Sequence, residues 1–329
     1  MRQFTLFIAA NGDQIAVDRI VSEHNGHDIP GEDYRIGSPS IFQKDKETGF
    51  ALEFVACAHL SISDNLARAI QASRMLLFKY CTSDFIDGIL RHANPRSAVS
   101  FSCCVFSEME TFHFDSVRLH MCELESGNNL PFSCRTLKID FPCRPACWMS
   151  LCLSCDTLAL EMRGNFITSD VFDHLRERKS PLSRLYISGT TLNGSLLDEL
   201  CLLTRSVLSV SNCLFGKSSS SCHVTVATPI QRLLLDLAGI KEDDVTSLLE
   251  RMKQVEEIQL PRIALGPRLL AALQHHESLT RLSIVRCSRV LRADAAPLNQ
   301  VKSVHITSSQ KKRIPSLRLW FPNADFLVL

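Results

Sequence analysis

Short stretches in which apolar and polar residues alternate recur along the chain at a nearly constant distance. They share a nine-residue frame, in which positions 1, 4 and 6 are apolar and position 9 is Cys, Asn or another small residue. One clear copy runs from Leu279 to Cys287, and another runs from Phe114 to Cys122. The alternation at positions 4 to 6 predicts a short strand that turns one face toward the core.

Twelve copies of this frame cover most of the chain. They begin at residues 57, 73, 96, 114, 134, 155, 182, 205, 230, 255, 279 and 301. Most neighbouring starts are 20 to 27 residues apart, and one short gap of 16 follows the first copy. A further strand is expected at Phe326 to Leu329. A fixed period of this size is typical of repeat proteins.

The ninth position falls where the backbone leaves the strand. A thiol or amide at this point can donate to a carbonyl of the neighbouring copy that would otherwise be unpaired in the core. Six copies hold such a residue: Asn65, Cys81, Cys104, Cys122, Cys213 and Cys287. The other six hold Pro142, Arg163, Thr190, Ala238, Ile263 and Ser309. We therefore expect an irregular array.

Helices are predicted between several of the strands. Residues 240–252 carry acidic residues in their first turn and an apolar stripe at Val245, Leu248, Leu249 and Met252. Residues 192–200 and 170–175 have similar patterns.

The frame, its period and the helical connections resemble the leucine-rich repeat, especially its intracellular ribonuclease-inhibitor-like and cysteine-containing types. The resemblance covers residues 57–329 in about twelve repeats. It implies an α/β solenoid that is curved, with parallel strands on the concave face and mostly helices on the convex face. Many cysteine-containing members are substrate receptors of ubiquitin ligases, so the resemblance predicts the fold better than the function.

Residues 1–56 do not fit the frame. Phe4–Ile8, the Asn11-Gly12 turn and Gln14–Val17 predict a hairpin, and residues 25–49 are expected to form a long loop. This segment is either an N-terminal cap over the open edge of the first repeat or a small adaptor-like element. The second interpretation rests on a similarity of its opening hairpin to BTB/POZ-type folds, which bind cullins.

Composition and charge limit the possible partners. Of 329 residues, 45% are hydrophobic and 22% are charged, which is sufficient for a packed core, and the net charge of +1 disfavours a general nucleic-acid binder. The charge is unevenly distributed. Residues 251–329 hold 13 basic and 5 acidic residues, a net of +8, whereas residues 1–250 have a net of −7. This polarity indicates either a partner with an acidic patch or simply a solvated surface.

The N-terminal sequence and the 14 cysteines favour an intracellular location. The first ten residues lack a complete signal peptide, and no run of 18 residues is continuously apolar. The cysteine content is below that of a disulfide scaffold. We therefore expect a cytoplasmic or nuclear protein without a membrane partner.

One cysteine cluster admits a zinc interpretation. Cys143, Cys147, Cys152 and Cys155 follow Cys134 closely, but only one pair has the two-residue spacing usual in zinc sites. The alternative is a core-facing helical stripe formed by Trp148, Leu151, Cys152 and Cys155. The stripe is favoured, so no metal or other cofactor is expected.

Known catalytic motifs are absent, and the histidines are scattered. We therefore expect a non-catalytic protein-interaction module that binds a partner protein on the concave face. The alternatives are a substrate-recognition subunit of a cullin-type ubiquitin ligase, and binding of RNA or another polyanion by the basic C-terminal repeats. The expected partner-binding residues occupy frame positions 3, 5, 7 and 8: Arg184, Tyr186, Arg232, Asp236, Glu257, Gln259, Arg262, Arg281, Arg286 and His305.

Overall fold

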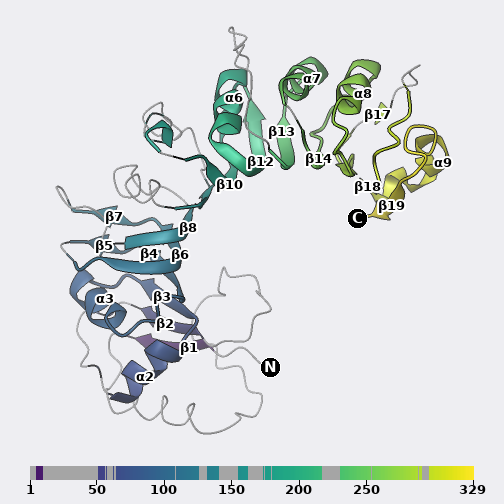
Figure 1. Ribbon diagram of the computed structural model, residues 1–329. Coiled ribbons are helices and arrows are strands. Elements are labelled where there is room, and N and C mark those ends of the chain that lie inside the picture. The colour runs from purple at the N-terminus through teal and green to yellow at the C-terminus, as the bar shows by residue number, and fades with distance from the viewer. Residues whose placement is uncertain are drawn as a thin grey trace, which may run out of the picture. The chain divides into compact units, whose positions relative to one another are not determined.

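Figure 1 shows a computed structural model of the chain. It describes residues 5–9, 51–55, 57, 62, 64–107, 109–125, 132–140, 155–161, 173, 175–178, 180–216, 230–252, 254–287, 289–290 and 296–329. The chain divides into two compact units, residues 1–155 and 156–329. Both are α/β units built on a parallel sheet.

The sheet of the first unit has the strand order β1-β2-β3-β4-β6-β8, and each pair of neighbours is parallel. Its strands are β1 (Thr5–Ala9), β2 (Ala51–Val55), β3 (Met75–Lys79), β4 (Ala98–Ser102), β6 (Phe112–His120) and β8 (Phe132–Asp140). Helices α2 (Asp64–Ala72) and α3 (Ser83–Leu90) connect strands, and β5 (Val105–Phe106) pairs with β7 (Glu123–Leu124).

The sheet of the second unit has the order β9-β10-β12-β13-β14-β16-β18-β19, again parallel. Its strands are β9 (Thr157–Glu161), β10 (Leu182–Ser188), β12 (Thr204–Phe215), β13 (Arg232–Ala238), β14 (Glu257–Gln259), β16 (Arg281–Ser283), β18 (Ser303–Ile306) and β19 (Asp325–Val328). Three short strands complete the unit. β11 (Thr191–Leu192) pairs with β12, and β15 (Ala264–Leu265) pairs with β17 (Arg289–Val290). The helical segments are α6 (Gly194–Leu202), α7 (Glu242–Arg251), α8 (Pro267–Gln274), the 3-10 helix η2 (Ser308–Arg313) and α9 (Ile314–Leu317). In Figure 1, α6, α7 and α8 lie along one side of the strands.

The fourth position of the frame forms a continuous buried row in each sheet. In the second unit, Leu208, Leu233 and Ile258 are successive partners across parallel strands, and each is fully buried. The same register continues to Phe326 in β19, which confirms the predicted closing strand. Stacking of this row buries apolar area that no single strand could bury alone.

The first predicted copy of the frame is misplaced. Leu52 lies opposite Leu76 in the register of β2 and β3, so this copy begins at residue 49 and Cys57 is its ninth residue rather than its first. Asn65, which was expected at the ninth position, lies instead in α2. The next start is then 24 residues away, and the anomalous gap of 16 disappears.

Two strands of the sheet come from residues 1–56. β1 pairs with β2 and β2 with β3, both in parallel. Gln14–Val17, the expected second arm of the hairpin, and the expected loop at 25–49 lie outside the described residues. The role of this segment as a cap or an adaptor stays a prediction.

In five of the described copies, the eighth position of the frame turns the chain out of the strand in a left-handed conformation. Tyr80, Cys103, Met121 and Asn212 have φ values of 51° to 55°, and Gly189 has a φ of 70°. Residues other than glycine pay a conformational cost in this region, so the recurrence of the turn at one frame position shows that packing of the repeat imposes it.

At Cys81 and Cys104 the ninth position hydrogen-bonds to the preceding copy, as expected, whereas the Cys213 thiol donates to the Ser211 carbonyl of its own copy. The Cys81 thiol donates to the Phe54 carbonyl over 3.4 Å, and the Cys104 thiol donates to the Phe78 carbonyl over 3.6 Å. In the copy that begins at 301, the predicted Ser309 is exposed, and Gln310 donates instead to the carbonyl of Ile284 over 3.0 Å.

A bulge explains a second departure at this position. The register of β12 and β13 shifts between Val210 and Cys213, so that Leu237 rather than Ala238 lies opposite Cys213. Leu237 is buried and Ala238 is exposed. The ninth position of the next copy therefore falls one residue earlier, at Leu237, and the left-handed residue of that copy is Gly239, with a φ of 87°.

The predicted helix at 240–252 is confirmed as α7, and all four residues of its apolar stripe are buried. The pattern at 192–200 corresponds to α6, whose N-cap Asn193 accepts a hydrogen bond from the Leu196 amide over 2.8 Å. Most of 170–175 lies outside the described residues. Among the helices that the structure describes, none is long and apolar enough to cross a membrane.

Candidate functional site

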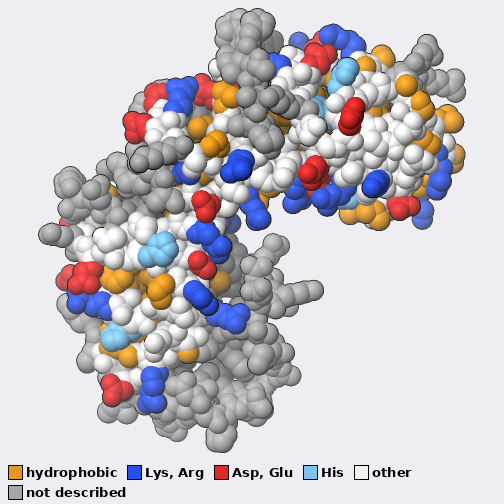
Figure 2. All heavy atoms as spheres, in the orientation of Figure 1, with side chains coloured by type: hydrophobic (Ala, Val, Ile, Leu, Met, Phe, Trp, Pro, Cys, Tyr) orange, Lys and Arg blue, Asp and Glu red, His pale blue; other side chains and the backbone are white. Residues whose placement is uncertain are grey.

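The expected partner-binding residues of the second unit lie on the strands β10 to β18 and on the turns that follow them. The register places Arg184, Val207, Arg232, Glu257 and Arg281 as successive partners in one row across the sheet. These residues hold the third frame position, so they lie on the opposite side of the strands from the buried fourth position; the three arginines are exposed there, whereas Glu257 is half-buried and Val207 is buried. Figure 2 shows basic side chains, with acidic ones between them, on the surface of this unit.

Glu257 lies between two arginines of this row and pairs with both. Its Oε2 is 2.8 Å from Nε of Arg232 and 3.4 Å from a terminal nitrogen of Arg281. The Glu257 side chain is 14% exposed, whereas those of Arg232 and Arg281 are 44% and 51% exposed. One carboxylate therefore orients two guanidinium groups, and the trio retains a net positive charge.

A second ion pair connects β13 with the turn after β16 and passes over β14, the strand that lies between them. Arg286, on the turn after β16, pairs with Asp236 of β13 at 2.5 Å. Asp236 is only 16% exposed, and its other oxygen accepts the backbone N–H of Asn212 over 3.3 Å. The carboxylate is therefore anchored in the sheet, and it holds an arginine that is 46% exposed.

Arg184 and Arg262 are both exposed, and neither forms an ion pair with any residue that the structure describes. Tyr186, Gln259 and His305 are half-buried on the strands. Gln259 and His305 lie on the same row of the register, separated by Ser283. The ten expected residues thus divide into an ion-paired group of five and flanking residues on the same strands and turns.

A cluster that the sequence reasoning missed lies on the sheet of the first unit. Arg118 of β6 forms a salt bridge to Asp140 at the end of β8, and the Lys138 ammonium is 3.6 Å from the other oxygen of Asp140. Glu53 of β2, nearly fully buried, pairs with Lys79 of β3 at 2.5 Å. These residues occupy the fifth and seventh positions of their frames, so the frame itself could have identified them once its first copy was placed correctly.

Several buried cysteines that the structure describes are suited to packing rather than to chemistry. Burial raises the pKa of Cys104 and of Cys287 to about 12, and that of Cys134 is raised to about 12 by burial and by the nearby Cys155. Thiols with raised pKa values hold little thiolate at neutral pH and are poor nucleophiles.

The candidate zinc ligands Cys143, Cys147 and Cys152 lie outside the described residues, as do Trp148 and Leu151 of the alternative helical stripe. Cys155 is fully buried. Within the described part of the chain, no three His, Cys, Asp or Glu side chains are close enough together to hold a metal ion.

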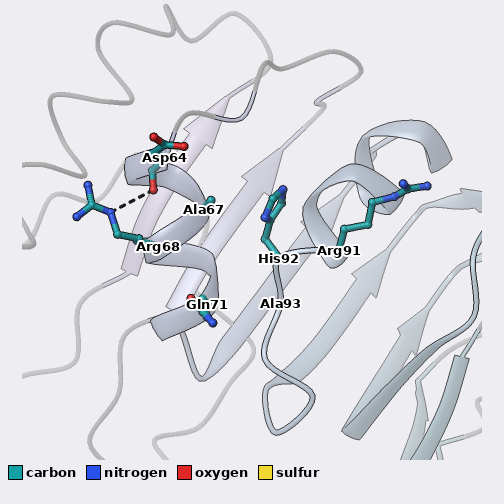
Figure 3. A pocket seen from close by; sticks show the side chains of 7 residues that line it. All are labelled: Asp64, Ala67, Arg68, Gln71, Arg91, His92 and Ala93. Carbon is teal, nitrogen blue, oxygen red and sulfur yellow. Dashed lines mark hydrogen bonds between the residues drawn. The ribbon is translucent and has the colours of Figure 1, made fainter.

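An open depression lies between α2 and the loop after α3 in the first unit (Figure 3). Its polar side chains do not converge. Arg68 bends back so that its Nε donates to the Asp64 carbonyl over 3.3 Å, and Arg91 pairs with Asp87 at 2.8 Å and Glu110 at 2.9 Å. His92 is left as the side chain that points between the helices (Figure 3). The depression does not have the convergent polar groups of a small-molecule site.

A scan against the profiles of known protein families gave no match for this chain, and a search of curated proteins found no similar sequence.

Proposed function

We propose that the chain is a leucine-rich-repeat solenoid whose exposed sheet face binds a partner protein. The recurring frame, the left-handed turn at its eighth position and the hydrogen bonds from its ninth position support the first part. In this type of fold the strands form the concave face and present one row of side chains from each repeat. Such a surface is extended and suits a protein partner better than a small ligand.

The observation that carries the proposed site is the arrangement of arginines on the second unit. Arg184, Arg232, Arg262, Arg281 and Arg286 occupy neighbouring strands and turns, and only Asp236 and Glu257 are acidic among the ten expected residues. The group therefore carries an excess of three positive charges. A partner that presents carboxylates to this surface is favoured by its field.

The half-buried carboxylates of Asp236 and Glu257 distinguish this surface from a diffuse positive patch. Asp236 and Glu257 limit the freedom of the arginines they hold, while roughly half of each guanidinium-bearing side chain remains accessible. Orientation in advance reduces the entropy lost on binding. Arginine can also donate two parallel hydrogen bonds to one carboxylate, and it is enriched at binding hot spots.

Replacement of Arg281 and Arg286 together by Glu tests this site. We expect the double variant to lose the partner that the wild-type protein captures in a pull-down, because the surface then repels an acidic patch. Arg268→Glu is the matched control. Arg268 lies on α8, is 69% exposed and pairs with Asp243 at 2.8 Å, so it is also an ion-paired surface arginine of the same unit.

The fold of all three proteins is checked by thermal unfolding. Loss of the captured protein from the double variant alone supports the site. Equal capture by the wild type and the double variant would refute it. If capture is lost equally with Arg268→Glu, the effect depends on general charge rather than on the sheet face.

A role as a substrate receptor of a cullin-type ubiquitin ligase is a narrower proposal. It rests on the resemblance to cysteine-containing repeats and on residues 1–56, of which the structure describes 5–9 and 51–55. Co-purification of a cullin or a cullin adaptor that is lost when residues 1–56 are removed would support it. Capture of a substrate-like partner without either component would count against it.

A further inference from the structure

Strand β19 is the last strand of the second sheet among those that the structure describes. Its neighbour among the described strands is β18, and the pair is parallel, with Val304 opposite Phe326 and Ile306 opposite Val328. The N–H groups of Asp325 and Leu329 donate to the carbonyls of Lys302 and Ile306, both over 2.9 Å. These bonds fix which backbone groups of β19 face the sheet.

The remaining backbone groups of β19 face outward. Successive residues of a strand direct their N–H and C=O groups to opposite sides. The N–H and C=O groups of Phe326 and Val328 therefore point away from β18. An edge with free donors and acceptors is a template for an added strand. The incoming strand would take its register from these two residues.

Exposed apolar side chains gather around this edge. Eight large hydrophobic residues of the described chain are exposed, and four of them lie between residues 319 and 329. These are Leu319 at 72%, Leu327 at 50%, Val328 at 42% and Leu329 at 70%. Half of the exposed large hydrophobic residues of the described chain therefore fall within its last eleven residues, three of them in or directly after β19.

The charge around the edge is positive and uncompensated. Lys302, Lys311, Lys312 and Arg313 are exposed and form no ion pair with a described residue, and the Arg318 guanidinium lies 5.9 Å from the centre of the Phe326 ring. Asp325 is the single acidic residue between 296 and 329. This end of the unit thus differs from the sheet face, where the carboxylates Glu257 and Asp236 hold three arginines.

We propose that β19 binds an acidic, extended segment of a partner protein, which adds to the sheet as a further strand. The backbone of Phe326 and Val328 supplies the hydrogen bonds, the exposed leucines supply apolar contacts, and the lysines and arginines select acidic side chains. This mode of recognition combines affinity from the main chain with specificity from alternate side chains. It is independent of the proposed site on the sheet face.

A fluorescein-labelled octapeptide of alternating Glu and Val is the probe, and its binding is measured by fluorescence anisotropy. Val328→Pro removes the outward N–H and leaves the bonds to β18 in place, because those come from neighbouring residues. We expect it to weaken binding of the peptide by roughly tenfold, the effect of about one lost backbone hydrogen bond and a poor fit of the ring. Val328→Thr keeps the N–H and the branched shape and is the matched control.

Three comparisons decide the outcome. Equal binding by Val328→Pro and Val328→Thr would overturn the added strand, and so would equal binding of a Lys and Val octapeptide. If an oligouridine of matched charge displaces the peptide equally well from Val328→Pro and from Val328→Thr, the surface is a polyanion site and the proposal fails.

Hydrogen exchange in the wild-type protein tests the same contact without the proline variant, so a folding defect of that variant cannot affect the result. The amides of Phe326 and Val328 should exchange rapidly in the absence of the acidic peptide and become protected when the peptide is added. Absence of new protection at these two amides at a saturating concentration of the peptide would also overturn the proposal.

Discussion

Phe78 lies at the centre of a stack of phenylalanine rings in the core of the first unit. It is fully buried on β3, with Phe54 on one side at 5.2 Å and Phe101 on the other at 5.3 Å between ring centres. The interplanar angles are 19° and 16°, so both contacts are stacked. Replacing Phe78 by Leu keeps an apolar side chain of moderate size and removes both ring contacts.

The expected cost follows from these two contacts. Each aromatic pair contributes about 0.5–1.5 kcal/mol beyond the area it buries, so Phe78→Leu should destabilise the unit by about 1–3 kcal/mol. Phe78→Ala also leaves a cavity, and the expected cost rises to about 3–5 kcal/mol. The leucine variant is more informative because the ring contacts account for most of its effect.

Hydrogen exchange measured by mass spectrometry reports stability separately along the chain. A loss of 1–3 kcal/mol corresponds to about 5- to 140-fold faster exchange in segments that open with this core. We expect this acceleration in peptides from β2, β3 and β4. Because repeats interact chiefly with their neighbours, β13 and β14 should keep their protection.

Tyr80→Leu is the matched control, since it makes the same kind of change two residues along the chain. Tyr80 is 63% exposed, so we expect a change within about 0.5 kcal/mol. Equal exchange in Phe78→Leu and the wild type would refute the stacking argument. Equal acceleration in β3 and β14 would refute the local coupling between repeats.

Three further predictions concern single side chains. Burial lowers the pKa of His276 below its usual 6.5, so the unfolded chain takes up a proton before the folded chain does, and the free energy of unfolding should decrease as the pH falls below about 6.5. His276→Gln should flatten this dependence in urea unfolding, and an unchanged slope would contradict the assignment. Asn193→Ala should cost about 1 kcal/mol because it removes the cap on the Leu196 amide, while Asn193→Ser should restore most of the loss in thermal unfolding. Cys81→Ala should cost about 1–3 kcal/mol because the buried Phe54 carbonyl loses its thiol donor; an unchanged urea midpoint would show that another group satisfies this carbonyl.

Much of the strand arrangement could be predicted from the sequence, because alternation within a strand is a local property. The fourth frame positions at Leu208, Leu233 and Ile258 are aligned in the structure as the frame implies. The error at residue 57 arose because Cys57 and Leu60 also fit the apolar first and fourth positions of the frame. The strand of this copy lies before them, at Ala51–Val55.

The ladder at the ninth position could be predicted only in part. Cys81 and Cys104 bond as expected, but Gln310 replaces Ser309 and Leu237 replaces Ala238. A long amide side chain reaches the same carbonyl from one residue further along, and a bulge shifts the register by one. Neither change alters the apolar pattern of the frame, so neither is visible in it.

The sequence by itself determined which residues enter the core, because the frame repeats an alternation that each strand carries within five residues. The tertiary structure decided which polar residues meet. Asp236 and Arg286 are fifty residues apart, and their pairing depends on the register of β13, β14 and β16 and on the turn after β16. Side-chain contacts between repeats follow from stacking and register, which are fixed only when neighbouring repeats bury their apolar rows against one another.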